Sequence, residues 1–347
     1  MASDNTIKNI LIVFLMVLVF YLLSVLSSII IPLVLALLCA ILFQPMIMFF
    51  LKKGVPKFLM LPIISIISLS ILFVIGLVTA DTVTQIAEQK DFLISKFLLK
   101  LDALLVQINE LFHLKLDSTM LVAELYSMIK EGWLADFAGS LASELGSFAS
   151  SFLWFALYYV MLLAGMSGYR EYIRYVGGRK ADELLHEYEV IQSSIVSYMG
   201  IKTILSLLVG TLTYLVCVFY GVKFAMFWGF IAFILNFIPS IGSILGTVLP
   251  ILMGVIQLDS ITDVGVMSII LIVMHFSIGN IVEPIVMGGQ LRINTLTVLF
   301  GLVFWGFVWG IPGMVLSVPL LVIMKIILER SQSTEMIGRL MGYPDKV

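Results

Sequence analysis

The chain has 347 residues, of which 61% are hydrophobic and 12% are charged, and its formal net charge is −2. Ordinary soluble domains are about half apolar and about a quarter charged, so this composition excludes a typical soluble protein. The nearly neutral charge argues against bulk binding to nucleic acid. We predict an all-α, polytopic helical membrane protein with about 8–10 membrane segments.

The N-terminal part, residues 1–80, is predicted to hold three membrane spans. Long apolar runs cover about residues 10–30, 32–51 and 58–80, each close to the roughly 20 residues that cross a bilayer. Pro32, between the first two runs, suits a hairpin or a broken joint. The first run is too long for a signal-peptide core and lacks a small-residue cleavage site, so we predict that it is retained.

Residues 81–147 form a predicted amphipathic helical region outside the bilayer. They contain ten acidic and five basic residues. Apolar residues recur at helical spacing over about 97–111 and 133–145, which is typical of amphipathic helices. We expect a small extracytoplasmic domain. A set of surface-lying helices without a core of their own is the alternative.

Residues 148–220 are predicted to contain two more spans, at about 148–166 and 201–220. The stretch between them, residues 167–200, is basic and amphipathic and is predicted to be a cytoplasmic helix. Lys202 begins the second span, and Lys325 lies near the end of the last apolar run. We expect both lysines to reach the membrane interface as snorkelling anchors.

Residues 221–330 are the predicted transport core, because proline and glycine interrupt two of their apolar runs. The interruptions lie at 236–242 and 310–313, and an uninterrupted span covers about 264–282 between them. Irregular backbone survives in lipid only against protein or a water-filled cavity, and paired interruptions point to a transporter binding site. Simple helix packing is the alternative. We expect two broken helical hairpins whose shape depends on Pro239, Gly242, Gly246, Gly310, Pro312 and Gly313.

Polar side chains cluster where the uninterrupted span ends, and we predict that they line the solute path. His275, Gly279 and Glu283 are spaced i, i+4, i+8 and would share one face of a regular helix. Asn280 lies three residues before Glu283, and Pro284 follows directly. A carboxylate in a lipid-embedded segment is costly unless it has a partner, water or a task.

Two further polar residues complete the predicted path. Asn236, beside the first interruption, supplies both a hydrogen-bond donor and an acceptor. Arg292 lies nine residues after Glu283 and is expected to turn back and pair with it. The alternative is that Glu283 and Arg292 are hydrated at the cytoplasmic interface, and that His275 only packs.

The sequence contains none of the common motifs of soluble enzymes. It contains no nucleotide-binding loop, no GxSxG and no HExxH, and its three histidines are scattered. We therefore predict that the protein is not an enzyme and has no cofactor and no metal site. Four basic groups fall on one side of the predicted spans, which places both termini and the tail at 331–347 in the cytoplasm. They are Lys8, the turn at 52–57, the cluster at 170–180 and the tail with Arg330 and Arg339.

Three blocks in the last third resemble the AI-2E transporter family. They read WGFIAFILNFIPSIGSILG at 228–246, GNIVEPIVMGGQLRINTLTVLFG at 279–301 and GIPGMVLSVP at 310–319. The likeness extends over essentially the whole chain. By position, the residues that match the family motifs are Asn236, Pro239, Gly242, Gly246, Asn280, Glu283, Pro284, Gly310, Pro312 and Gly313.

The resemblance implies export of a small polar signalling molecule of the autoinducer-2 type, used in quorum sensing, across the bacterial inner membrane. It also implies homo-oligomers, as pentamers, with the polar solute and membrane lipids as the other partners. Some family members resemble Na⁺(Li⁺)/H⁺ antiporters, which gives the first alternative function. A membrane scaffold that recruits partners through residues 81–147 is the second.

Overall fold

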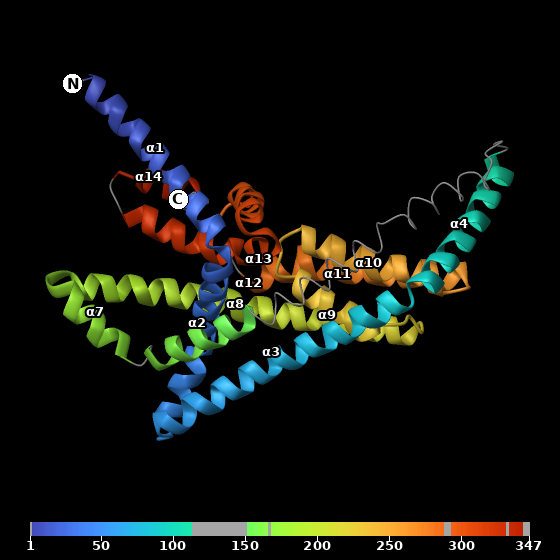
Figure 1. Cartoon of the computed structure of the whole chain (residues 1–347), viewed down its shortest axis with the longest axis horizontal. Helices are drawn as coiled ribbons and strands as arrows, with labels where there is room; N and C mark the ends of the chain where they lie inside the picture. The colour runs from blue at the N-terminus through green and yellow to red at the C-terminus, as the bar shows by residue number, and fades with distance from the viewer. Residues whose placement is uncertain (1, 113–150, 166–167, 288–292, 331–332, 343–347) are drawn as a thin grey trace. The chain divides into compact units, whose positions relative to one another are not determined.

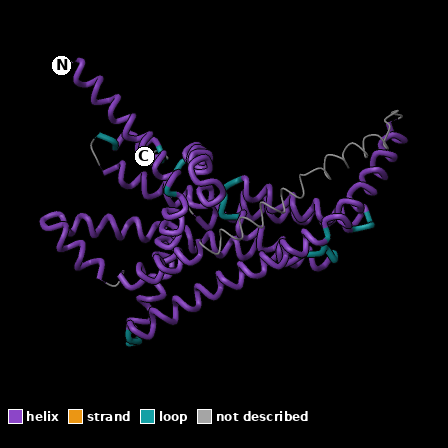
Figure 2. The backbone as a smooth tube through the Cα atoms, in the orientation of Figure 1, coloured by secondary structure: helices purple, strands orange, loops and turns teal. Residues whose placement is uncertain are grey.

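The computed structural model describes residues 2–112, 151–165, 168–287, 293–330 and 333–342 (Figures 1 and 2). Over these residues the regular elements are helices, together with one isolated bridge between Ile293 and Gly342. The all-α prediction is confirmed. The helices of the first half are α1 (Ala2–Val25), α2 (Ser27–Lys52), α3 (Lys57–Glu88), α4 (Lys90–Phe112), Ser151–Gly165, α7 (Tyr169–Gly177), the 3₁₀ turn Gly178–Lys180 and α8 (Ala181–Phe219). Those of the second half are α9 (Ala225–Leu235), α10 (Ile241–Gln257), α11 (Ile261–Ser277), the π-helix η4 (Ile278–Val282), α12 (Glu283–Met287), α13 (Thr295–Arg330) and α14 (Glu335–Leu340).

The described helices are those of a multi-pass membrane protein. Four stretches are long and apolar enough to cross a bilayer, and five shorter apolar helices accompany them. Large apolar side chains lie on the surface along α1 and elsewhere, including Phe219 and Phe307. Exposed apolar surface of this extent marks contact with lipid or another protein. The four long stretches are Ser27–Gln44, Tyr169–Phe219, Ile261–Met287 and Thr295–Arg330.

The chain forms two compact units, each built from separate stretches of sequence. The first unit comprises Met1–Leu69, Ser150–Thr203 and Pro284–Val347, and the second comprises Ser70–Ala149 and Ile204–Glu283. The unit boundaries fall inside α3 and α8, so both helices run from one unit into the other. The domain limits expected from composition at 80, 147, 220 and 330 remain a prediction.

The core of the first unit joins helices from both ends of the chain. Leu38 and Ile41 of α2 cluster with Trp305, Trp309 and other buried residues. The indole Nε1 of Trp309 donates a hydrogen bond of 2.9 Å to the carbonyl of Leu23 in α1. This carbonyl lies next to the joint between α1 and α2, which is the single residue Leu26 rather than Pro32. Helical hydrogen bonds continue through this joint, from Leu26 to Leu22 and from Ile30 to Leu26. The two helices are therefore nearly continuous, and the hairpin or broken joint expected at Pro32 is not found, since Pro32 lies inside α2.

The core of the second unit packs α8, α9, α10 and α11. Cys217 of α8 clusters with Met253 of α10 and with Met267 and Leu271 of α11. Residues on α8 and α9 approach backbone to backbone, since a Cβ on Gly210 would lie 2.7 Å from the carbonyl oxygen of Gly229. Small residues permit this close packing between membrane helices.

Both predicted hairpins exist. Helices α9 and α10 are antiparallel arms, because Ala232 lies 3.5 Å from the position of a Cβ on Gly246. Helix α13 also doubles back: a Cβ on Gly301 would lie 2.4 Å from the side chain of Leu321. In a straight helix those two residues would be roughly 30 Å apart. The reversal occurs at Gly310, whose φ of 64° and ψ of −143° are not helical.

Two lysines differ from their predicted role as interfacial anchors. Lys202 of α8 is only 2% exposed, so its side chain is enclosed by protein rather than reaching outward. Lys325 of α13 is mostly buried, and its ammonium lies 3.5 Å from the carboxylate of Glu329 one turn later. Charge alone did not distinguish an anchor from an enclosed residue, because a long aliphatic stem suits both positions.

Candidate transport site

The first hairpin turn is built around a buried amide. Asn236 ends α9 and is 5% exposed. Its Nδ2 donates a hydrogen bond of 2.9 Å to Oγ of Ser206, a fully buried residue of α8. A buried polar group without a partner costs about 1–3 kcal/mol, so this bond anchors the turn to α8.

The same turn contains a strained serine. The carbonyl of Pro239 accepts a hydrogen bond of 2.6 Å from the backbone N–H of Ile241. Ser240 between them has φ 60° and ψ −55°, which is the geometry of the rare γ-turn with positive φ. Strain of this kind persists only where the surroundings impose it, and it clusters at functional sites.

The packing around Gly242 explains why the residue just after the turn has no side chain. A Cβ on Gly242 would lie 1.7 Å from the carbonyl oxygen of Leu235, so no side chain fits there. Four residues later, a Cβ on Gly246 would lie 3.1 Å from Cε1 of His275. The two glycines thus keep one face of α10 open for α9 and α11.

His275 is the most enclosed polar side chain of α11. It is 3% exposed, and its Nε2 lies 3.2 Å from Oγ1 of Thr213, which is fully buried on α8. In the part of the chain that the structure describes, Nδ1 of His275 is buried and has no hydrogen-bond partner. An imidazole carries one donor and one acceptor when neutral, so the ring has capacity for one further polar contact.

Helix α8 contributes both of these polar partners from one face. Ser206 and Thr213 are seven residues apart, which is two helical turns. One reaches Asn236 on the hairpin, and the other reaches His275 on α11. Neither α8 residue was predicted. The available signal was the heptad spacing of these two residues among the several hydroxyl residues of the span.

The helix that follows α11 departs from regular α-helix at Ile278. Residues Ile278–Val282 form a π-helix, and Pro284, two residues beyond it, has no N–H to continue the normal pattern. Single π turns are frequent at functional sites. The wider turn interrupts the regular face that the spacing of His275, Gly279 and Glu283 predicted.

The remaining predicted path residues take different positions. Asn280 is exposed, and its Nδ2 donates to the carbonyl of Phe276 on its own helix at 3.2 Å. Glu283 is partly buried at the start of α12. Gly279 lies near the first hairpin, since a Cβ there would be 4.0 Å from Cβ of Ser243. Arg292 lies outside the described residues, so its predicted pairing with Glu283 remains a prediction.

The second hairpin turn is more exposed than the first. Gly310, Ile311 and Pro312 are all exposed, whereas Gly313 is buried. A Cβ on Gly313 would lie 2.0 Å from the carbonyl oxygen of Trp305. This turn belongs to the first unit and the Asn236 turn to the second. That both turns line one passage therefore stays a prediction.

Helical hairpins with non-helical turns and buried polar pairs, on a multi-pass membrane chain, are an architecture typical of transporters. A model of the AI-2E family transporter matches residues 9–333, and the chain belongs to this family. A Haemophilus influenzae protein with only a general transport role in its name is 30% identical over 310 residues, 87% of each chain. The AI-2 transport protein TqsA of Escherichia coli is 36% identical over 153 residues, 44% of each chain. YhhT of Escherichia coli, named only as a candidate transport protein, is 26% identical over 303 residues, 87% of this chain and 85% of YhhT.

Proposed function

We propose that the chain exports a small polar signalling molecule of the autoinducer-2 type across the bacterial inner membrane. Membership of a transporter family supports a transport role, and the partial similarity to the AI-2 transport protein TqsA supports this solute class. The observation that carries the proposal is the pair of buried polar contacts, Asn236 with Ser206 and His275 with Thr213, that meet one face of α8.

These groups suit a solute with several hydroxyls. Such a solute leaves water only if directed donors and acceptors replace its hydration, because each unmatched polar group costs about 1–3 kcal/mol. The Asn236 amide and the buried Nδ1 of His275 provide such groups, and the exposed amide of Asn280 provides another. The exchange of protein–protein for protein–solute hydrogen bonds would allow binding without leaving a group unpaired.

We further propose that both termini are cytoplasmic, that the chain acts as a homo-oligomer, as a pentamer, and that it is not an enzyme. In this arrangement Pro239 and Pro312 keep the hairpin turns non-helical. Glu283 and Arg292 lie at the inner end of the path. The region at 81–147 faces outward and covers the outer mouth.

The direct test is efflux of labelled autoinducer-2 from proteoliposomes that contain the purified chain. Wild-type protein is expected to release the solute faster than empty liposomes do. Asn280→Ala is the most informative variant, because among the described residues its exposed side chain bonds to its own helix, so its loss should have little effect on folding. We expect about three- to tenfold slower efflux, the equivalent of one lost hydrogen bond.

Ser193→Ala is the matched control. Ser193 is exposed on α8, and its Oγ donates to the carbonyl of Val190 on its own helix at 3.0 Å. This variant removes the same kind of contact away from the proposed path and should retain wild-type efflux. Wild-type protein without solute release would contradict the proposal, and equal efflux from both variants would remove Asn280 from the path.

A cation/proton antiporter is the second candidate function, and His275 favours it. A buried imidazole with an unpartnered nitrogen in the described structure is suited to carry a proton. Everted vesicles should then show a pH change that depends on Na⁺ or Li⁺ and needs no organic solute. His275→Gln keeps a polar side chain but cannot carry the proton, so it should abolish that signal.

A further inference from the structure

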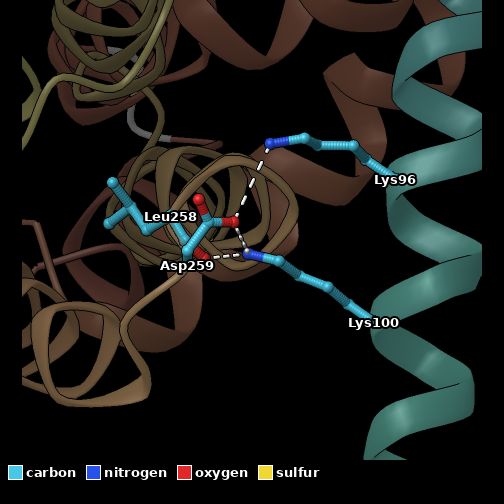
Figure 3. A network of polar contacts seen from close by, with 4 residues as sticks. All are labelled: Lys96, Lys100, Leu258 and Asp259. Atoms are coloured by element: carbon cyan, nitrogen blue, oxygen red, sulfur yellow. Dashed lines mark hydrogen bonds and ion pairs between the residues drawn. The ribbon is translucent and has the colours of Figure 1, made fainter.

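A lysine pair on α4 contacts the connection between α10 and α11. Lys96 and Lys100 are one helical turn apart, so their side chains share a face of α4. Their ammonium nitrogens lie 3.8 Å and 3.9 Å from the same carboxylate oxygen of Asp259. Figure 3 shows the two side chains reaching from α4 to this one acceptor.

Lys100 makes a second contact that fixes where α10 ends. Its ammonium also donates a hydrogen bond to the carbonyl of Leu258, the C-cap residue of α10 (Figure 3). A cation at this position neutralises the negative end of the helix dipole and satisfies a free carbonyl. The pKa of Lys100 is lowered from its ordinary value, mainly because burial disfavours the charged form; Lys96 adds to this shift and Asp259 opposes it.

A third lysine ties the preceding connection to the same part of the chain. Lys223, between α8 and α9, donates to Oε1 of Gln89 at 3.4 Å, and its ammonium lies 5.1 Å from the ring centroid of Phe92 in α4. Its backbone N–H donates to Oε1 of Gln257 at 2.6 Å. The α8–α9 connection is therefore held at the start of α4, by Gln89 and Phe92, and the α10–α11 connection is held one to two turns further along the same helix.

We propose that Lys96, Lys100 and Asp259 form an ionic latch whose closure positions the connection between α10 and α11 against α4. The pairs are long and Asp259 is 88% exposed, so the latch is weak and reversible rather than a permanent brace. Two ammonium groups share one carboxylate, and loss of Asp259 would leave two like charges facing each other. The latch is therefore expected to open when Asp259 is neutralised or when salt screens it.

The position of the latch gives it a role in transport. The two helices that this connection joins carry Gly246 on α10 and His275 on α11, which meet in the candidate site. Lys96, Lys100 and Asp259 are thus positioning residues, since they act through the helices and not through contact with the solute. The latch itself does not depend on the proposed function, whereas its effect on efflux does.

Hydrogen exchange of the full-length chain in nanodiscs tests the latch independently of any solute. Asp259→Asn should increase the exchange rate of the backbone amides of α4, α10 and α11 around the latch by about two- to fivefold at low salt. This is the range expected for the loss of exposed ion pairs. Wild-type protein should show the same increase in 1 M salt, where the screening length falls to about 3 Å.

A charge exchange separates the latch from simple packing of lysine stems. Lys96→Glu alone places two carboxylates together and should open the latch. Adding Asp259→Lys restores one negative charge between two positive ones, and the carboxylate introduced at position 96 also lies favourably one turn before Lys100. The double variant should recover wild-type exchange. Glu335→Gln, which breaks the 2.5 Å pair with Arg339 inside α14, is the matched control and should leave α4 unchanged.

Two results would overturn the latch: unchanged exchange in Asp259→Asn, or a double variant that exchanges as fast as Lys96→Glu alone. Efflux of labelled autoinducer-2 from the same variants tests the positioning role, which predicts slower efflux in Asp259→Asn and recovery in the double variant. If efflux stays at the wild-type rate while exchange accelerates, the positioning role is wrong. If wild-type protein carries no solute, the proposed function fails and the exchange data still decide the latch.

Discussion

The two helical hairpins reverse the chain by different means. The α9–α10 turn uses five residues, 236–240, and includes a γ-turn at Ser240 and a buried amide bonded to α8. The turn in α13 depends on Gly310, in a conformation open to glycine, and its surface is exposed. Each turn is followed by a buried glycine placed against a carbonyl of the preceding arm.

This comparison separates two requirements of a helical hairpin. Reversal of the chain can come from one glycine with positive φ or from a longer turn fixed by side-chain hydrogen bonds. Close approach of the arms, by contrast, needs a residue without a side chain at Gly242 and at Gly313 alike. The predictions below test the shared requirement first and the different ones afterwards.

The largest effect is expected from alanine at the two packed glycines. In Gly242→Ala and Gly313→Ala the new methyl group meets a backbone carbonyl at 1.7 Å and 2.0 Å. The backbone has to move, at a cost of about 3 kcal/mol or more. Thermal unfolding in detergent should show a lower melting temperature for both variants. Gly279→Ala, whose nearest neighbour is 4.0 Å away, is the control. A wild-type melting temperature in either packed variant would disprove the shared requirement.

Smaller changes in stability, of opposite sign in the two turns, should distinguish one turn from the other. Gly310→Ala meets no atom within 4 Å but adopts a strained conformation, at a cost of about 1–3 kcal/mol. Ser240→Gly relieves a positive φ and should stabilise the protein by up to about 1 kcal/mol. Denaturation of the two variants side by side gives the sign of each change in unfolding free energy. Destabilisation by Ser240→Gly would mean that the serine side chain holds the turn.

The smallest effect concerns the amide that only the first turn has. Asn236→Ala and Ser206→Ala each leave one buried partner unmatched, while the double variant removes both. A double-mutant cycle on unfolding free energy should therefore give a coupling energy of about 1 kcal/mol. Coupling near zero would show that the 2.9 Å contact does not anchor the turn.

The sequence was sufficient to locate both hairpins, because proline and glycine have few other roles inside an apolar run. It also singled out Asn236, which the structure shows buried and bonded to Ser206, while its place in the solute path stays a prediction. It did not identify Ser206 or Thr213, since periodicity shows which residues share a face but not which helix that face meets. The regular face through His275 and Glu283 assumed 3.6 residues per turn, and the π-helix at Ile278–Val282 breaks that assumption.

The bond between Trp309 and Leu23 has a consequence for biogenesis. Its partners are separated by 286 residues, and the first unit takes its last stretch from Pro284 onward. During synthesis, the second unit has all of its residues before that stretch leaves the ribosome. Helix α1 therefore lacks its indole partner until the chain has been extended by a further 286 residues.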